Sequence, residues 1–313
     1  MRELLHHLRA FLRDDGDPRS YAVILTSLIV LLTLVVGLDI QGEVLDEYHL
    51  DPRQIPLYMA FYGLPWLLAV ICHATFTRRL AALRDPHLWL AALAALALYS
   101  IYANFHYYAD WIATHVDPRA RAFVFRCAAN LARAGLGFVL VLAFWCIADR
   151  RRQPLYGLQR GAFRARPYLL ILLGLVPLVT WASFQPDFLE FYPRHTPGRE
   201  QAFLSPAAST AIFELCYGAD FVFTELFFRG LLVLGFTRWL GPGAVLPATV
   251  WYALTHVAKP VGELVGSVFG GFALAAIACR TRSIRGGILL HLGLAYMMEL
   301  AAILQKAALT AAS

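Results

Sequence analysis

The stretch YAVILTSLIVLLTLVVGLDI, residues 21–40, is apolar along nearly its whole length, and Asp39 is its one charged residue. About 20 residues of this kind, wound as an α-helix, cross the hydrocarbon core of a bilayer. Similar runs recur along the 313-residue chain, in which 59% of the residues are hydrophobic and 15% are charged. A soluble enzyme needs a more polar surface than this composition provides. The sequence therefore predicts an all-α polytopic membrane bundle with eight or nine transmembrane helices.

The distribution of arginine predicts which side of the membrane each loop occupies. The expected spans are 21–40, 57–76, 88–109, 123–147, 168–184, 206–230, 243–257, 261–279 and 288–306. With the N-terminus in the cytoplasm, most arginines outside the spans fall on the cytoplasmic side, including the run DRRRQP at 149–154. This is the pattern of the positive-inside rule, and it holds only if the short spans 168–184 and 243–257 are real. It also accounts for the net charge of +6, so no nucleic-acid partner is expected.

Composition divides the chain into four parts. Residues 1–20 mix arginines with acids and predict a cytoplasmic amphipathic helix on the membrane surface, or alternatively a partner-binding segment. Residues 21–148 form an expected accessory transmembrane bundle, and residues 149–167 a basic inner loop rich in arginine, proline and glycine. Residues 168–313 hold most of the buried acids and are interpreted as the functional core. Lysine is rare and alanine abundant, which is typical of GC-rich bacteria and favours the bacterial inner membrane.

Two spans carry regular patterns of their own. In the fourth span, Arg126, Asn130 and Arg133 share one helical face. Charges at this depth face the bundle interior, so an ion pair between helices is expected, with a contact to a substrate carboxylate as the alternative. In the eighth span, glycines recur at intervals of four and predict the close approach of another helix; they are Gly262, Gly266 and Gly270.

The stretch FVFTELFFRG, residues 221–230, places Glu225 and Arg229 one helical turn apart. Inside a membrane these two charges need each other, so a structural ion pair is one interpretation. Glu214 precedes Glu225 by about three turns and is expected on the same face.

Histidines in the later spans favour chemistry over a purely structural pair. Tyr252 and His256 lie four residues apart, and His291 shares a face of the last span with Glu299. A glutamate and a histidine together activate water by general-base catalysis. A second histidine can donate a hydrogen bond to a developing oxyanion.

These motifs resemble those of the CAAX-protease and bacteriocin-processing family of glutamic intramembrane proteases. That family's pattern is E-E-x-x-x-R, then F-x-x-x-H, then H-x-x-x-N or D, and the similarity covers roughly residues 205–305. Glu225, Arg229, His256 and His291 match it, and Tyr252 stands for the phenylalanine. The sequence departs from it in two places: Thr224 occupies the position of the family's usual base, and Ala295 that of the final Asn.

The resemblance implies a metal-independent endopeptidase without cofactors that cleaves a membrane-associated peptide or protein. Glu225 with His256 is expected to deprotonate water, while His291 stabilises the oxyanion and Arg229 holds Glu225. Glu214 is an alternative base, and Glu299 an alternative for the polar group missing at Ala295.

Three other interpretations compete with this one. The chain is an inactive relative that binds membrane peptides or scaffolds a complex if an acid at Thr224 is indispensable. It is a transporter if Glu214, Asp220, Glu225 and Arg133 relay protons or ions. It is a zinc enzyme if the two histidines and a glutamate bind the metal, although no H-E-x-x-H spacing supports this.

Overall fold

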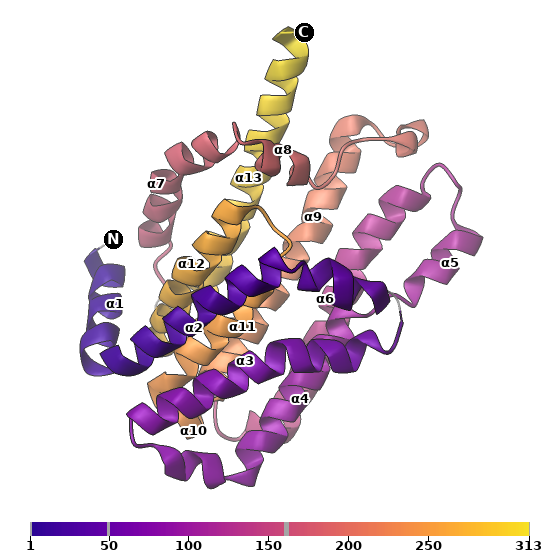
Figure 1. Ribbon diagram of the computed structural model, residues 1–313. Coiled ribbons are helices and arrows are strands. Elements are labelled where there is room, and N and C mark those ends of the chain that lie inside the picture. The colour runs from indigo at the N-terminus through magenta and orange to yellow at the C-terminus, as the bar shows by residue number, and fades with distance from the viewer. Residues whose placement is uncertain (1, 49–50, 160–162, 313) are drawn as a thin grey trace.

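The computed structural model describes residues 2–48, 51–159 and 163–312, and residues 160–162 of the expected basic loop, with Arg160, lie outside this description. The described residues form helices and no strand (Figure 1). The α-helices are α1 Arg2–Asp14, α2 Pro18–Gly37, α3 Gln54–Phe76, α4 Pro86–Ala103, α5 Tyr108–His115, α6 Arg121–Phe144, α7 Arg166–Ala182, α8 Pro186–Phe191, α9 Pro206–Glu225, α10 Thr237–Leu240, α11 Val245–Leu254, α12 Val261–Thr281 and α13 Arg285–Ala312. Short helical segments of other types are η1 Gln41–Leu45, η2 Asp46–Tyr48, η3 Leu80–Arg84, η4 Trp145–Asp149, η5 Arg199–Ala202, η6 Leu226–Gly235 and η7 Gly241–Ala244.

Six helical segments of the described chain are long and apolar enough to cross a membrane. They are Pro18–Gly37, Gln54–Phe76, Pro86–His115, Arg121–Asp149, Val261–Thr281 and Arg285–Ala311. Each coincides with one expected span. The other three expected spans correspond to α7, to α9 with η6, and to α11. The structure therefore confirms a helical membrane protein and leaves the count of eight or nine spans unconfirmed.

The helix α11 is much shorter than a membrane span. It has 10 residues, which is about 15 Å of helix and roughly half of a hydrocarbon core. All of these residues are buried in the bundle. The expected span 243–257 is therefore helical only over Val245–Leu254, and His256 lies in the turn that follows. Hydropathy cannot distinguish such a buried helix from a crossing one.

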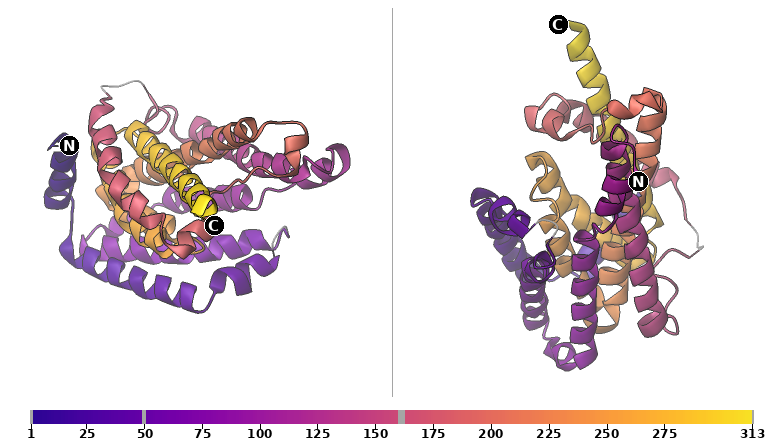
Figure 2. Two further views of the ribbon diagram at one scale, coloured as in Figure 1. Left: turned by 90° about the horizontal axis from the view of Figure 1, so that it is seen from above. Right: turned by 90° about the vertical axis from the view of Figure 1, so that its right-hand side faces the viewer.

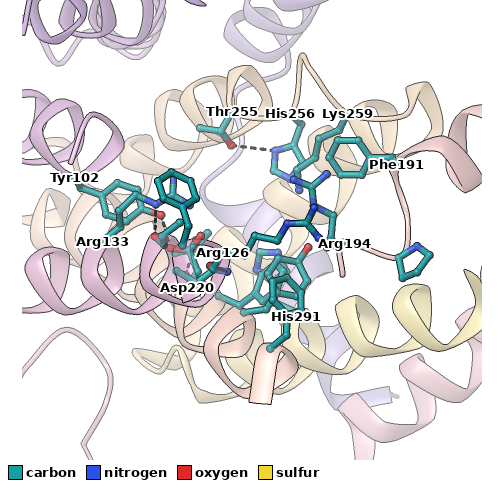
Figure 3. A pocket seen from close by; sticks show the side chains of 18 of the residues that line it. Tyr102, Arg126, Arg133, Phe191, Arg194, Asp220, Thr255, His256, Lys259 and His291 are labelled. Carbon is teal, nitrogen blue, oxygen red and sulfur yellow. Dashed lines mark hydrogen bonds between the residues drawn. The ribbon is translucent and has the colours of Figure 1, made fainter. Parts of the chain in front are cut away.

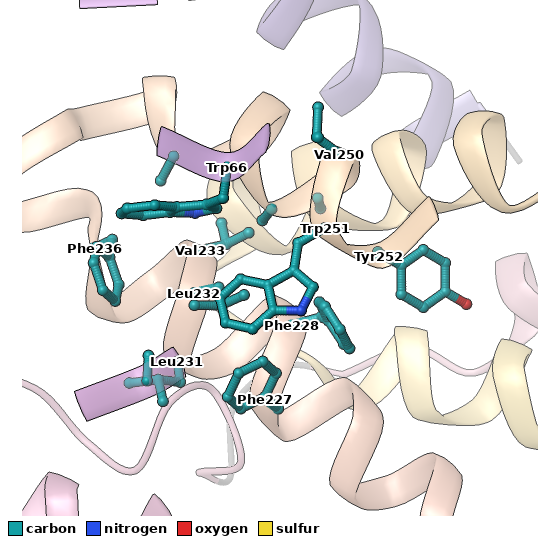
Figure 4. Close-up of a cluster of buried hydrophobic side chains, with 14 of the residues drawn as sticks. Trp66, Phe227, Phe228, Leu231, Leu232, Val233, Phe236, Val250, Trp251 and Tyr252 are labelled. Carbon is teal, nitrogen blue, oxygen red and sulfur yellow. The ribbon is translucent and has the colours of Figure 1, made fainter. Parts of the chain in front are cut away.

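The central element is α9, which continues without a break into the π-type helix η6. All ten residues of η6 are buried, and this element packs against α11 and α12. Trp251 of α11 contacts Phe227 and Phe228 of η6, and Trp66 of α3 lies against Phe236 (Figure 4). Residues from both halves of the chain therefore share one hydrophobic core.

Large apolar side chains cover the outside of the bundle, as lipid-facing helices require. Among the exposed ones are Leu68 of α3, Val139 of α6 and Leu173 of α7.

The glycine ridge of α12 has a different environment from the one expected. A side chain added at Gly262, Gly266 or Gly270 would meet open space, so no described helix approaches them closely. Their neighbour Gly271 faces the Tyr252 ring instead. The predicted close approach of another helix at these three glycines is therefore wrong.

One end of the bundle gathers the expected cytoplasmic segments; we call it the basic end. Here Trp239 of the α10 segment donates to Asp85 at 2.8 Å, and Arg238 pairs with Asp149. The helix α1 docks nearby, where Arg280 of α12 pairs with Asp14 at 2.7 Å. Hydrogen bonds from Arg13 and Arg280 lower the pKa of the Asp14 carboxyl to about 2, so this pair stays charged at physiological pH. The helix α8 and the end of α13 lie at the other end of the bundle (Figures 1 and 2).

Candidate active site

Glu225 and Arg229 form an ion pair deep inside the protein. The Arg229 Nη1 and Glu225 Oε1 atoms are 3.0 Å apart. Glu225 is 0% exposed and Arg229 is 2% exposed. A methyl group at Gly287 of α13 would overlap the Glu225 carboxylate, so only glycine allows α13 to approach this closely. Both charges therefore point into the bundle, as the sequence predicts.

His291 is the second partner of Glu225. The His291 Nδ1 and Glu225 Oε1 atoms are 3.0 Å apart, and the two residues come from α13 and α9. A carboxylate only accepts hydrogen bonds, so this contact assigns the proton of neutral His291 to Nδ1. The Nε2 atom then carries the lone pair. It lies 3.4 Å from the Tyr252 hydroxyl.

Tyr252 connects the buried ion pair to the other histidine. The Arg229 guanidinium carbon lies 4.1 Å from the centre of the Tyr252 ring, in a cation–π contact. The Tyr252 and His256 rings are 4.6 Å apart. His256 Nδ1 donates a hydrogen bond to the Tyr252 carbonyl oxygen, 2.9 Å away. The Nε2 atom of His256 is 3.9 Å from the carboxylate of Glu263.

The two histidines line one cavity of about 740 Å³ (Figure 3). Thr224 also lines it, whereas Glu225 does not. Glu225 makes its ion pairs with Arg229 and His291, and none with His256 among the described residues. The sequence predicts that Glu225 and His256 act together as the general base. The structure corrects this, because the histidine that contacts Glu225 is His291. Thr224 and Glu225 point in different directions because successive residues of a helix are rotated by about 100°.

Glu214 and Glu299 lie away from this site. About three turns of helix, roughly 16 Å, separate Glu214 from Glu225. The Glu214 carboxylate lies near Glu299 instead. The Glu299 carboxylate accepts the backbone N–H of Arg194, at 3.0 Å from each oxygen. Neither acid lines the cavity, and neither does Ala295. The two expected replacements for missing family residues are thus not brought to the histidines.

The polar face of α6 contributes to the same cavity. Arg126, Asn130 and Arg133 all line it. The expected ion pair between helices is absent from the described chain, because no carboxylate lies within ion-pair distance of Arg126 or Arg133. The guanidinium carbon of Arg133 lies 5.8 Å from the centre of the Tyr102 ring, in a cation–π contact.

Two acids near the site have hydrogen-bond partners that the sequence did not predict. Asp220 lines the cavity and accepts a hydrogen bond of 2.5 Å from the Tyr102 hydroxyl. Glu263 binds Lys259 at 2.5 Å and accepts from the Tyr192 hydroxyl at 2.7 Å. Tyr102 and Tyr192 lie far from these acids in the sequence, so spacing along one helix gives no signal for them, whereas Lys259 precedes Glu263 by only four residues. Within the described residues, no three His, Cys, Asp or Glu side chains are grouped as metal ligands would be.

Comparison with known proteins agrees with this arrangement of motifs. Residues 207–297 match the family model described as type II CAAX prenyl endopeptidase Rce1-like. No curated protein and no solved structure matches the chain. The matched residues include Glu225, Arg229, His256 and His291, the residues on which the resemblance rested. Over this segment the chain is similar to the type II CAAX prenyl endopeptidases, a family of proteases.

Proposed function

We propose that the protein is an intramembrane endopeptidase in which the Glu225–His291 pair activates water. One observation carries the proposal: a buried carboxylate holds Nδ1 of a histidine that lines a polar cavity. A carboxylate in this position fixes the tautomer and orientation of a histidine base and stabilises its protonated form. His256, on the wall of the same cavity, supplies a second nitrogen at the reaction centre.

The proposed reaction is a hydrolysis in which every proton has a place. His291 Nε2 takes a proton from water while the water oxygen attacks the scissile carbonyl carbon, and the carbonyl electrons move to its oxygen. His256 donates to this oxyanion only as the imidazolium, which takes up a second proton from solvent at Nε2 before the reaction; the Glu263 carboxylate, 3.9 Å from Nε2, stabilises that charge. When the intermediate collapses, the carbon–nitrogen bond breaks and His291 returns its proton to the leaving amine. Glu225 acts through His291, and Arg229 and Tyr252 hold the pair in place.

The substrate in this proposal is a membrane-associated peptide or protein, reached in the bacterial inner membrane with the N-terminus of the enzyme in the cytoplasm. We propose nine crossings. The helix α7 and the continuous α9–η6 add two crossings to the six long segments. The short α11 completes the ninth together with the turn 255–260, whose Thr255, His256 and Lys259 line the cavity. Irregular backbone is tolerated at membrane depth where it lines such a cavity.

A cleavage assay tests the proposal. The full chain in phospholipid vesicles is incubated with a quenched, S-prenylated peptide of the C-a-a-X type, the substrate class named by the matching family. We expect cleavage by the wild type and its loss in His291→Ala and His256→Ala. Glu225→Gln should lower kcat by about ten-thousand-fold with KM little changed, the result for an orienting carboxylate. The matched control is His87→Ala, an exposed histidine outside the cavity, which should leave both constants unchanged.

A second candidate function is favoured by Thr224. This residue, and no glutamate, stands on the cavity wall at the position of the family's usual base. An inactive relative would bind membrane peptides in the cavity without cleaving them. Saturable peptide binding by a wild type that cleaves no peptide would support this second function over the first.

A further inference from the structure

The wall of the cavity carries more positive than negative charge. Its basic residues are Arg126, Arg133, Arg194, Lys259 and Lys306, and its acidic residues are Asp220 and Glu190. Of these basic residues, only Lys259 forms an ion pair within the described chain, with Glu263 of α12. Tyr102, Arg133 and Asp220 gather at one side of the cavity, and His256, Lys259 and Arg194 at the other (Figure 3). The cavity therefore favours an anionic occupant over a neutral one.

Two arginines of α6 are available to such an occupant. Arg126 and Arg133 are seven residues apart, which is about two turns on one helical face. Arg133 donates through Nε to the Ala129 carbonyl at 2.5 Å, so one donor is anchored while the terminal amino groups stay free. Asn130 lies between Arg126 and Arg133 on this face and donates to the backbone carbonyl oxygen of Arg126 at 3.0 Å. Because this hydrogen bond uses only the backbone of Arg126, its guanidinium stays free to bind a ligand.

Neither acid of the cavity forms an ion pair with these arginines within the described chain. The Asp220 carboxylate is engaged by the Tyr102 hydroxyl and attracts Arg133 only from beyond ion-pair distance. Glu190 likewise makes no ion pair within the described residues. Unpaired arginines at membrane depth are costly, and a bound anion offsets that cost. Guanidinium groups bind carboxylates in bidentate geometry.

We propose that Arg126 and Arg133 bind a carboxylate of the substrate, from its C-terminus or from an Asp or Glu side chain. This inference rests on the proposed function and narrows its substrate class to chains that present a negative charge a few residues from the bond cut at the histidines.

The experiment measures binding with peptides that resist cleavage. The full chain in phosphatidylcholine nanodiscs is titrated with dansylated, S-farnesylated Cys-Val-Ile-Ala whose backbone amides are N-methylated. Three forms are compared: the free acid, the C-terminal amide, and an amide with aspartate in place of isoleucine. We expect at least one carboxylate form to bind the wild type about tenfold more tightly than the neutral amide, as a charge-assisted hydrogen bond provides. The forms that gain affinity identify which carboxylate is bound.

Variants assign that preference to the two arginines. The double variant Arg126→Gln, Arg133→Gln should bind all three forms with equal affinity, and the double Lys variant should keep part of the preference. Arg121→Gln removes a charge from the same helix outside the cavity and should keep the full preference. Equal binding of all forms by the wild type would overturn the proposal, as would an equal loss in Arg121→Gln. Because cleavage plays no part, carboxylate-dependent binding without proteolysis would sink the proposed function alone, and proteolysis without carboxylate preference would sink this inference alone.

Discussion

At the scale of single residues, the neighbours Thr224 and Glu225 have different surroundings. Thr224 faces the cavity, while Glu225 is enclosed between Arg229, His291 and the backbone of Gly287. An acid that is fully enclosed cannot itself contact a substrate water, but it can orient a histidine that does. In the proposed function, this division of roles lets a chain with threonine on the cavity wall use a histidine as its base.

Replacing Thr224 with glutamate tests that division directly. A carboxylate placed on the wall beside His256 and His291 offers a second base, so Thr224→Glu should raise kcat of an active wild type by no more than about tenfold, a small part of what acid–base catalysis contributes. Thr224→Ala should change it little. The measurement is steady-state cleavage of the prenylated peptide. A wild type without activity that becomes active in Thr224→Glu would instead identify the chain as an inactive relative.

Replacing Arg229 should lower the free energy of unfolding more than replacing an exposed arginine. Removing it leaves Glu225 buried without its cationic partner, which costs about 3–5 kcal/mol in the free energy of unfolding. Arg229→Gln should therefore lower the thermal midpoint in detergent, as followed by intrinsic fluorescence. The double variant with Glu225→Gln should recover much of the loss, because no uncompensated charge remains. Equal losses in the single and double variants would show that the pair is held by packing alone.

The sequence predicted the site at this scale only within single helices. Spacing of four residues paired Glu225 with Arg229 and Tyr252 with His256, and the structure places both pairs in contact. Contacts between helices, such as Glu225 with His291, depend on how α9 and α13 pack and have no counterpart in local spacing. The same limit applies to Glu214. It shares a helical face with Glu225, but a shared face does not bring together two side chains that are three turns apart.

At the scale of elements, hydropathy predicted nine spans, and six of them coincide with long apolar segments of the described chain. The helix α9 carries the acids Glu214, Asp220 and Glu225 and is therefore less apolar than an ordinary crossing helix. The helix α11 is wholly apolar yet too short, because it is surrounded by protein. The proposed function uses both features: polar groups on α9, and a turn after α11 that brings His256 to the cavity.

The close approach of α13 to α9 gives a test at this scale. A methyl group at Gly287 overlaps the Glu225 carboxylate, so Gly287→Ala must push α13 and His291 away from Glu225. We expect a loss of about 1–3 kcal/mol in the free energy of unfolding, typical of overpacking, together with at least a tenfold fall in kcat. Gly266→Ala on α12 meets open space and serves as the control, with little change in either quantity. Unchanged cleavage in a stable Gly287→Ala would contradict the Glu225–His291 contact.

At the scale of the whole molecule, charge separates the two ends of the bundle. The basic end contains α10, the start of α13 and the basic loop, which the positive-inside rule assigns to the cytoplasm. The cavity is lined by Glu190, Arg194 and Thr196, which follow α7 at the opposite end. The sign of this charge asymmetry could be predicted from the positions of the arginines, but only the fold relates it to the position of the cavity.

The cavity should therefore open away from the cytoplasm. In a variant whose five native cysteines are replaced, a cysteine at Thr196 should react in intact cells with a maleimide that does not cross the membrane. A cysteine at Arg151 should react only after the cells are permeabilised. Mass spectrometry of the purified protein reports both reactions. The opposite pattern, in which the cysteine at Arg151 reacts in intact cells and the cysteine at Thr196 does not, would show that the protein has the opposite orientation in the membrane.

The most direct test of the central claim, proteolysis by the His291 site, is a comparison of protein termini in living membranes. Membranes from cells that carry the wild type, His291→Ala or His87→Ala are enriched for new N- and C-termini and compared by mass spectrometry. The account predicts a set of termini that is present with the wild type and with His87→Ala and is lost with His291→Ala. A wild type that generates no termini of its own, or termini that persist undiminished in a folded His291→Ala protein, would contradict it.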